Sequence, residues 1–338
     1  MRLRRIFSLL LACALLLPAG LLEAQKTEKA DGYAEWRKGD TLIVDGQRVQ
    51  ADDHTKFKGK KIGSLASIPL GYEVTVTGRR LEDGTLVAGT IEAKPNGTAL
   101  FEDDVKKATD EIEAVWLRDG SMFEPGKDGK REEIGPIVES GPAELRVHRI
   151  LTRLVPPYVS PDRLRTHVVK TDEWNAAAMG NGAIWVYTGL LDEMSDDELA
   201  IILGHELTHY THEHSRRNAK KAMWGEIAAA TAVVALDQID NDTARGLSLL
   251  GTMLSFTAWH SGYSRDFEDQ ADRVGLRYAY EAGYDVAKGP RVWERFRDKY
   301  GDSNAVTNFF FGGHSRPSNR IRNIEHELRL NYRDVRQD

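Results

Sequence analysis

The stretch LGHELTHYTHEH, residues 203–214, holds four histidines and two glutamates within twelve positions. His205 and His209 are four residues apart, so on a helix both imidazoles face the same way and can bind one metal ion. Glu206 follows the first of these histidines and can act as a general base on a metal-bound water. This His-Glu-x-x-His spacing is typical of zinc proteases and predicts a hydrolytic metal site.

A catalytic zinc ion needs a third protein ligand, and the candidates lie downstream in EDQAD, residues 268–272. Glu268 and Asp272 are four residues apart on a predicted helix. One carboxylate can therefore bind the metal while the other orients a ligand histidine through its second ring nitrogen. The alternative is an ordinary acidic helix face, which would include Asp266 and Asp269 as well. The pattern by itself leaves both interpretations open.

The other histidines near the motif have different expected roles. His212 is expected to lie exposed at the end of the site helix, and His214 is expected to be structural or to contact a metal ligand. His260 lies eight residues before Glu268 and is a candidate ligand for the open metal position in a resting, self-inhibited state. An ordinary loop histidine is the alternative at that position.

The pair HELTH and EDQAD resembles the HtpX- and BepA-type zinc metallopeptidases, the family that also holds the CAAX prenyl endopeptidases. The stretches NAAAMGNGAIWVYTGLL and SDDELAIILGHELTHYTHEH are similar to the strand, turn and site helix of that family. The resemblance covers roughly residues 145–330. The activity that it implies is hydrolysis of peptide bonds in polypeptide substrates.

Carried over by position, the resemblance implies one Zn²⁺ per chain. Its ligands would be His205, His209 and Glu268. Glu206 would be the general base, and Asp272 would hydrogen-bond a zinc-bound histidine.

The family also has a late His-Pro-x-x-x-x-Arg signature near its active-site cleft. His314 and Arg320 keep the six-residue offset of that signature, but Ser315 replaces the proline, which appears as Pro317. A shorter alignment on Arg316 and the following proline is the alternative. The resemblance implies that His314 and Arg320 are catalytic residues that contact the oxyanion or the substrate.

The stretch AAAMGNGAIWVY, residues 176–187, is expected to offer an edge strand to an extended peptide. Strand addition gives backbone hydrogen bonds with little sequence preference, which favours unfolded or misassembled proteins as substrates. The candidate substrate-binding residues are Ala178, Met179, Gly180, Asn181 and Gly182.

Residues 1–24 are predicted to be a secretory signal, because arginines precede an apolar run from Ile6 to Leu17. That run is short for a transmembrane helix, and an uncleaved anchor is the alternative. Cys13, the one cysteine of the sequence, lies in LLAC, which resembles a bacterial lipoprotein signal. We therefore expect export to the periplasm or cell envelope of a bacterium, with membrane association through a lipidated Cys13 or an uncleaved signal as the alternatives.

Residues 33–96 are predicted to form a small antiparallel β-barrel of OB or SH3 type, after a polar linker at 25–32. Asp-Gly pairs at 45–46 and 83–84 indicate hairpin turns between short β-prone stretches. This barrel lies outside the family resemblance and is a candidate site for an envelope partner.

Residues 100–335 are predicted to form a mainly helical, zincin-like metallopeptidase domain with a small β-sheet, so the expected class is α+β. Apolar periodicity predicts helices near 101–116 and 145–154, with a charge-rich loop at 119–133. The site helix is expected to begin after Ser195, with Glu198 completing a capping box.

Two alanine-rich runs, 222–236 and 246–259, are each too short to span a bilayer. We expect them to form a buried helical hairpin against the site helix, and contact with a membrane surface is the alternative.

The composition, 41% hydrophobic and 29% charged, is that of a globular protein. With a net charge of -6 and a pI near 6.0, no nucleic-acid partner is expected. The leading hypothesis is an exported zinc endopeptidase that acts on envelope proteins. The alternative is a latent envelope chaperone or binding protein with a zinc-stabilised core. Glu206 argues against that alternative, because a structural zinc site needs no base beside its ligand.

Overall fold

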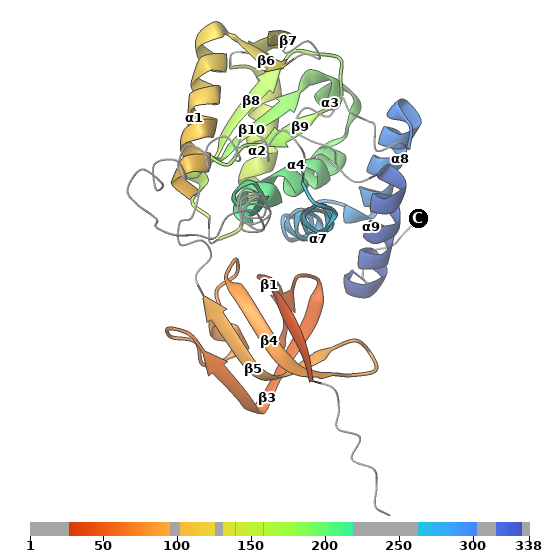
Figure 1. Ribbon diagram of the computed structural model, residues 1–338. Coiled ribbons are helices and arrows are strands. Elements are labelled where there is room, and N and C mark those ends of the chain that lie inside the picture. The colour runs from red at the N-terminus through yellow and green to blue at the C-terminus, as the bar shows by residue number, and fades with distance from the viewer. Residues whose placement is uncertain are drawn as a thin grey trace, which may run out of the picture.

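The computed structural model describes residues 27–94, 102–125, 131–138, 140–157, 159–218, 263–302 and 316–332. Within these residues the chain forms a closed β-barrel and a larger domain of helices around one sheet (Figure 1). The part of the sequence outside the described residues includes the predicted signal with Cys13, the two alanine-rich runs, His260 and His314.

The barrel consists of five strands: β1 (Thr27–Lys38), β2 (Thr41–Val44), β3 (Gln47–Lys58), β4 (Glu73–Arg80) and β5 (Leu86–Lys94). The strand order is β1-β2-β3-β5-β4, and pairing of β1 with β4 closes it. The predicted closed barrel is confirmed, but its expected all-antiparallel pairing is wrong, because β3 and β5 are parallel. The chain crosses the barrel after β3 through a short 3₁₀ helix, Leu65–Ser67, and this crossing brings β5 alongside β3 in the same direction.

The first barrel strand begins at Thr27, so the expected linker at 25–32 is wrong from that residue onward. Thr27 to Gly32 pair with β4 in register. Of these six residues only Ala30 is buried, which explains why the stretch lacks an apolar alternation. A polar sequence can form a barrel strand where its backbone is paired and most of its side chains face water.

The larger domain holds a five-stranded sheet: β6 (Ser121–Pro125), β7 (Arg131–Val138), β8 (Arg165–Val169), β9 (Ala176–Ala178) and β10 (Ala183–Tyr187). Its order is β6-β7-β8-β10-β9, with β10 parallel to β8 and antiparallel to β9, which lies at the edge. The loop expected at 119–133 is wrong, because β6 and β7 form a hairpin there. Its charged residues Glu132 and Glu133 are exposed on β7, next to the edge strand β6.

The helices are α1 (Glu102–Asp119), α2 (Pro142–Leu154), α3 (Thr188–Glu193), α4 (Asp196–Thr211), α7 (Arg265–Glu281), α8 (Gly289–Tyr300) and α9 (Pro317–Asn331). The helices predicted near 101–116 and 145–154 are confirmed as α1 and α2. Across the described ranges, no helix combines the length and apolar character that crossing a membrane requires.

Apolar side chains cover both faces of the sheet. Ile184 and Val186 of β10 belong to the core under α2, α4 and α7, whereas Trp185 and Tyr187 belong to a second cluster on the α1 side. Trp185 meets Trp116 of α1 edge to face, with ring centroids 5.0 Å apart. Burial on both faces explains the unbroken apolar run of this strand.

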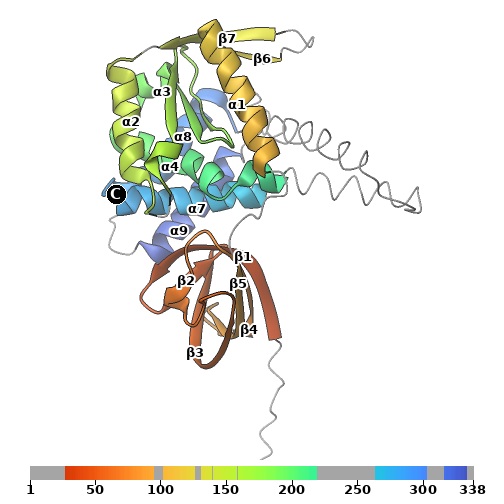
Figure 2. The same ribbon diagram turned by 90° about the vertical axis from the view of Figure 1, so that its left-hand side faces the viewer.

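Helices α4 and α7 cross in close contact at Gly204 and Gly275. A Cβ atom added at Gly275 would lie 2.4 Å from the backbone nitrogen of His205, and one added at Gly204 would lie 2.5 Å from the Gly275 carbonyl oxygen. Neither position has room for a side chain, so the two helix backbones touch. The crossing brings the histidines of α4 against the acidic residues of α7, and the barrel lies beneath these helices (Figures 1 and 2).

Candidate metal centre

Helix α4 carries the two histidines of the motif deep inside the domain. The helix begins as expected, because the Ser195 hydroxyl accepts from the Glu198 backbone N–H at 3.4 Å and the Glu198 carboxylate accepts from the Ser195 N–H at 2.8 Å. His205 and His209 are each only 2% exposed. Their Nε2 atoms face one another 3.0 Å apart. The buried helix α4 thus holds both imidazole rings side by side in the interior of the domain.

Helix α7 adds Glu268 to these two histidines. Its carboxylate oxygens lie 3.6 Å from Nε2 of His205 and 3.5 Å from Nε2 of His209. One ligand atom from each of the three residues lies within 4.8 Å of the others. Two Zn–N bonds in a tetrahedral site would separate the nitrogens by roughly 3.3 Å. Two imidazoles and one carboxylate at these separations fit a catalytic zinc ion.

Asp272 holds the first histidine from behind. Its carboxylate lies 2.9 Å from Nδ1 of His205. A histidine that binds a metal through Nε2 carries its proton on Nδ1, and the carboxylate is the acceptor for that proton. Asp272 therefore occupies the position that orients a ligand, one turn along α7 from Glu268.

Arg320 lies behind Asp272. It is 1% exposed, its Nε lies 3.0 and 3.1 Å from the two carboxylate oxygens of Asp272, and its guanidinium lies 3.3 Å from the centre of the Trp293 ring. Its Nη2 lies 2.7 Å from Nδ1 of His205, so from the first turn of α9 Arg320 contacts a ligand histidine as well as the carboxylate behind it. The expected oxyanion or substrate contact stays a prediction for this residue.

His214 contacts the second ligand histidine. Its Nδ1 lies 2.8 Å from Nδ1 of His209, and its ring stacks on Phe267 at 4.6 Å. Burial keeps the pKa of His214 well below its usual value, so the ring is neutral. Tyr263 stacks on the ring of His209 itself, with centroids 3.9 Å apart. Tyr263 and Phe267 were not predicted, because aromatic contacts between helices leave no local spacing signal.

His212 is fully buried, so its expected exposure is wrong. Burial lowers the pKa of His212 to about 3, with further lowering by nearby arginines. Its ring lies 6.2 Å from that of Tyr33 on β1, and its Nδ1 contacts the Thr211 hydroxyl at 3.0 Å. The barrel covers this end of α4, which the sequence of the helix alone does not reveal.

Glu206 is fixed by the edge strand of the sheet. The backbone N–H of Ala178 donates to its Oε2 at 3.1 Å, while its Oε1 lies 4.0 Å from Nε2 of His205. The general-base candidate thus lies beside the metal ligands and against β9. The structure brings together the predicted residues His205, Glu206, His209, Glu268 and Asp272, and His214 and Arg320 contact this group.

The turn after β9 has a structural role. Met179 is fully buried and its sulfur accepts from the Trp185 indole at 3.3 Å. The Asn181 side-chain amide donates to Glu113 at 2.7 Å, and a Cβ at Gly180 would lie 2.3 Å from Val105. Gly182, with a φ of +88°, closes the turn. The side chains of Met179 and Asn181 therefore stabilise the turn, and the backbone contacts expected between this stretch and a substrate stay a prediction.

Glu113 of α1 binds two basic side chains next to this turn. Its carboxylate accepts from Arg165 at 2.7 and 2.8 Å and contacts His167 at 2.8 Å. Burial raises its pKa, but these hydrogen bonds outweigh burial and bring the pKa of Glu113 down to about 2. An ionised carboxylate therefore ties α1 to the sheet beside the site.

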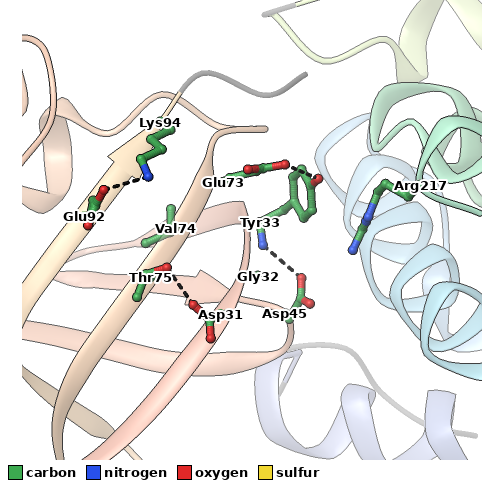
Figure 3. A pocket seen from close by; sticks show the side chains of 10 residues that line it. All are labelled: Asp31, Gly32, Tyr33, Asp45, Glu73, Val74, Thr75, Glu92, Lys94 and Arg217. Carbon is green, nitrogen blue, oxygen red and sulfur yellow. Dashed lines mark hydrogen bonds and ion pairs between the residues drawn. The ribbon is translucent and has the colours of Figure 1, made fainter. Parts of the chain in front are cut away.

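A separate hollow of about 290 Å³ opens where the barrel meets the end of α4 (Figure 3). Tyr33 and Asp45 line it from the barrel, and Arg217 lines it from the peptidase side. None of its lining residues belongs to the histidine and glutamate cluster. This hollow is therefore distinct from the metal centre.

The buried His-His-Glu cluster, with a glutamate beside it on the site helix, defines a metallopeptidase. Residues 143–328, more than half of the sequence, match the family described as peptidase family M48, and the chain belongs to that family. This confirms the resemblance to HtpX- and BepA-type metallopeptidases. Residues 31–92 match a Domain of unknown function (DUF5666).

Several curated proteins are similar to part of the chain. "Metalloprotease YcaL" of Escherichia coli is 40% identical over 105 residues, which are 31% of this chain and 40% of the relative. "Metalloendopeptidase OMA1, mitochondrial" of Bos taurus is 33% identical over 145 residues, 41% of this chain and 27% of the relative. A "Putative beta-barrel assembly-enhancing protease" of Vibrio cholerae is 31% identical over 129 residues, 37% of this chain and 27% of the relative. The matches thus span less than half the length of each of these relatives.

Proposed function

We propose that this protein is a zinc-dependent endopeptidase that hydrolyses unfolded or misassembled proteins in the bacterial envelope. The observation that carries the proposal is the buried cluster of His205, His209 and Glu268 with Glu206 beside it. A closed structural zinc site has no need of that glutamate.

Zinc held by these three ligands would polarise the scissile carbonyl and lower the pKa of a bound water. Glu206 then accepts the proton of the attacking water and passes it to the leaving amine. The Ala178 N–H holds Oε2 of Glu206, so this carboxylate keeps one orientation during both transfers. Asp272 accepts the Nδ1 proton of His205, and Arg320 neutralises Asp272, so both are positioning residues.

The edge of β9 is the proposed docking position for an extended substrate. The bonds from the Tyr187 N–H to the Asn175 carbonyl and from the Met179 N–H to the Ala183 carbonyl turn alternate residues toward β10. The backbone groups of Ala176 and Ala178 consequently face away from β10. The Ala178 N–H among them is already bonded to Glu206, so substrate pairing would use the remaining groups of this edge. Backbone pairing at this edge would accept many sequences, as an enzyme for unfolded chains requires.

Burial of the site favours a second candidate, a latent chaperone or binding protein with little turnover. The ligand histidines are 2% exposed, and Ala176 and Ala178 are each 5% exposed. In this structure the site and β9 are therefore closed to a polypeptide substrate. His260 is the proposed ligand of such a resting state, and His314 stays the proposed oxyanion contact.

The start of the sequence supports the proposed setting. The arginine-led apolar start of the sequence is the proposed signal, and Cys13 is the proposed lipid attachment site. One relative carries a name that refers to β-barrel assembly, which supports substrates among assembling envelope proteins. The barrel is proposed to be of OB type, because its order β1-β2-β3-β5-β4 includes a 3₁₀ helix between β3 and β4. We propose that it binds an envelope partner.

The test is to measure bound metal and casein cleavage for the full-length protein and for Glu206→Gln. We expect one zinc per chain in both proteins and cleavage only in the wild type. General-base catalysis contributes about 10² to 10⁴ in rate, so residual cleavage by the variant should be at least about a hundredfold slower. Folded protein without metal would refute the proposal, and zinc without any cleavage would favour the latent protein.

A further inference from the structure

The two ligand histidines are supported in different ways. His205 is held by Asp272, a carboxylate of the same helix that supplies Glu268. His209 contacts His214 instead, at 2.8 Å between their Nδ1 atoms. A neutral imidazole has one acceptor nitrogen and one donor nitrogen. If Nδ1 of His214 accepts from His209, its Nε2–H therefore needs an acceptor of its own.

The onward partner of His214 is Gln270. Nε2 of His214 lies 3.1 Å from Oε1 of Gln270, which also accepts from Arg217 at 2.8 Å. Gln270 is 2% exposed. Its side-chain amide therefore has to be satisfied inside the protein.

The amide nitrogen of Gln270 reaches the barrel. It donates to Oε1 of Glu35 on β1 at 2.9 Å and to Oδ1 of Asp45 in the β2–β3 turn at 2.6 Å. A flipped amide would set its oxygen against two carboxylates and its NH₂ group against Arg217, so the orientation is determined. Each donor in the series has an acceptor, from His209 through His214 and Gln270 to the barrel.

The carboxylates at the barrel end are themselves held. Glu35 is 2% exposed and accepts from Arg273 at 3.0 Å and from the Gly46 N–H at 3.2 Å. Asp45 accepts from the Tyr33 N–H at 3.0 Å, and it lines the hollow beside Arg217 (Figure 3). Contacts within the barrel therefore help to fix both carboxylates that accept from Gln270.

We infer that the barrel is part of the metal centre: Glu35 and Asp45 position the ligand His209 through Gln270 and His214. The barrel carboxylates hold the Gln270 amide, the amide fixes the Nε2–H tautomer of His214, and His214 accepts the Nδ1 proton of His209. Nε2 of His209 then points at the metal position. The inference rests on the proposed metal site and assigns to the barrel a role in building it.

The test begins with Gln270→Met in the full-length protein, which removes the amide and keeps the side-chain length. We expect zinc affinity, measured by competition with a chromophoric chelator, to fall about tenfold, as for other groups behind a metal ligand. The absorption spectrum of bound Co²⁺ should change, because the orientation of His209 is no longer fixed. The melting temperature of the metal-free protein reports folding separately.

The barrel end is tested with the double variant Glu35→Gln/Asp45→Gly. Glycine suits position 45, where φ is +44°. This variant should weaken zinc binding alone but add no further loss to Gln270→Met, because both changes interrupt one path. Arg277→Met is the matched control, since Arg277 lies 4.6 Å over the Trp36 ring of the barrel without touching the series. Its zinc affinity should equal that of the wild type.

The outcomes are distinguishable. A wild-type protein that binds no metal would overturn the proposed metal site itself. A wild type that binds zinc while Gln270→Met binds it equally well would overturn the inference alone. Full additivity of the barrel variant with Gln270→Met, or an equal loss in Arg277→Met, would show that the barrel acts by general docking and would also overturn it.

Discussion

Gly275→Ala tests whether the contact between α4 and α7 sets the geometry of the metal centre. The added Cβ would lie 2.4 Å from the backbone nitrogen of His205, whereas ordinary contacts begin at 3.4 Å. The obstacle is backbone, so the helices must separate by about 1 Å at the crossing. Ligand distances in metal sites tolerate only about 0.2 Å. The same separation moves Glu268 away from both histidines, so we expect zinc affinity to fall more than about tenfold.

The stability cost of this substitution should be small by comparison. Overpacking costs about 1–3 kcal/mol, and alanine recovers about 1 kcal/mol of helix propensity over glycine. The net loss of about 1 kcal/mol corresponds to a fall in melting temperature of roughly 2–4 °C for the metal-free protein. Chelator competition and thermal unfolding measure the two effects separately.

Gly63→Ala is the matched control, because a Cβ at position 63 meets nothing within 4 Å. Zinc affinity and melting temperature of that variant should equal those of the wild type. A Gly275→Ala protein that binds zinc as tightly as the wild type would refute the claim that the glycine contact sets the ligand positions.

Two further predictions concern groups behind the site. Asp272→Asn keeps the size of the side chain but removes the carboxylate that accepts the Nδ1 proton of His205, so zinc affinity should fall about 10- to 100-fold, as competition with a chelator would measure. Unchanged affinity would contradict this role. Glu113 has a folded pKa of about 2, below its ordinary 4.5, so its ionised form stabilises the fold above about pH 4.5 and that contribution is lost as the pH falls toward 2. Urea unfolding should show Glu113→Gln less stable by about 1–3 kcal/mol at pH 7, a range reduced for the solvent exposure of Arg165. The difference should shrink between pH 4.5 and 2, and a difference independent of pH would contradict the assignment.

The local chemistry of the site could be predicted from the sequence. Histidines four apart share a helix face whatever surrounds the helix, so His205 and His209 were predictable as a pair. The capping box at Ser195 is likewise a contact between neighbours in sequence. The proposed third ligand, Glu268, could not be predicted from spacing alone, because spacing did not distinguish a ligand helix from an acidic helix face. Family resemblance resolved that choice.

The errors share a physical cause. His212 ends a helix and would be exposed in isolation, but the barrel, about 180 residues earlier in the chain, covers it. Arg320 keeps a family spacing, but its contacts with Asp272 and His205 depend on the packing of α9 against α7. Burial and partner choice depend on elements that are distant in sequence, and periodicity within one element carries no information about them.

The sequence by itself determined which residues can bind a metal and which element carries each of them, because those properties depend on side-chain chemistry and local spacing. Only the tertiary structure decided how they meet. The glycine contact lets the α4 and α7 backbones approach one another at the ligands, and the barrel supplies the carboxylates that end the series from His209. Glu35 and Gln270 are 235 residues apart, and no local pattern links them. Their contact forms because the barrel packs on α7 and buries the side chain of Gln270. Among the described residues, the acceptors of its two amide N–H groups are Glu35 and Asp45 of the barrel.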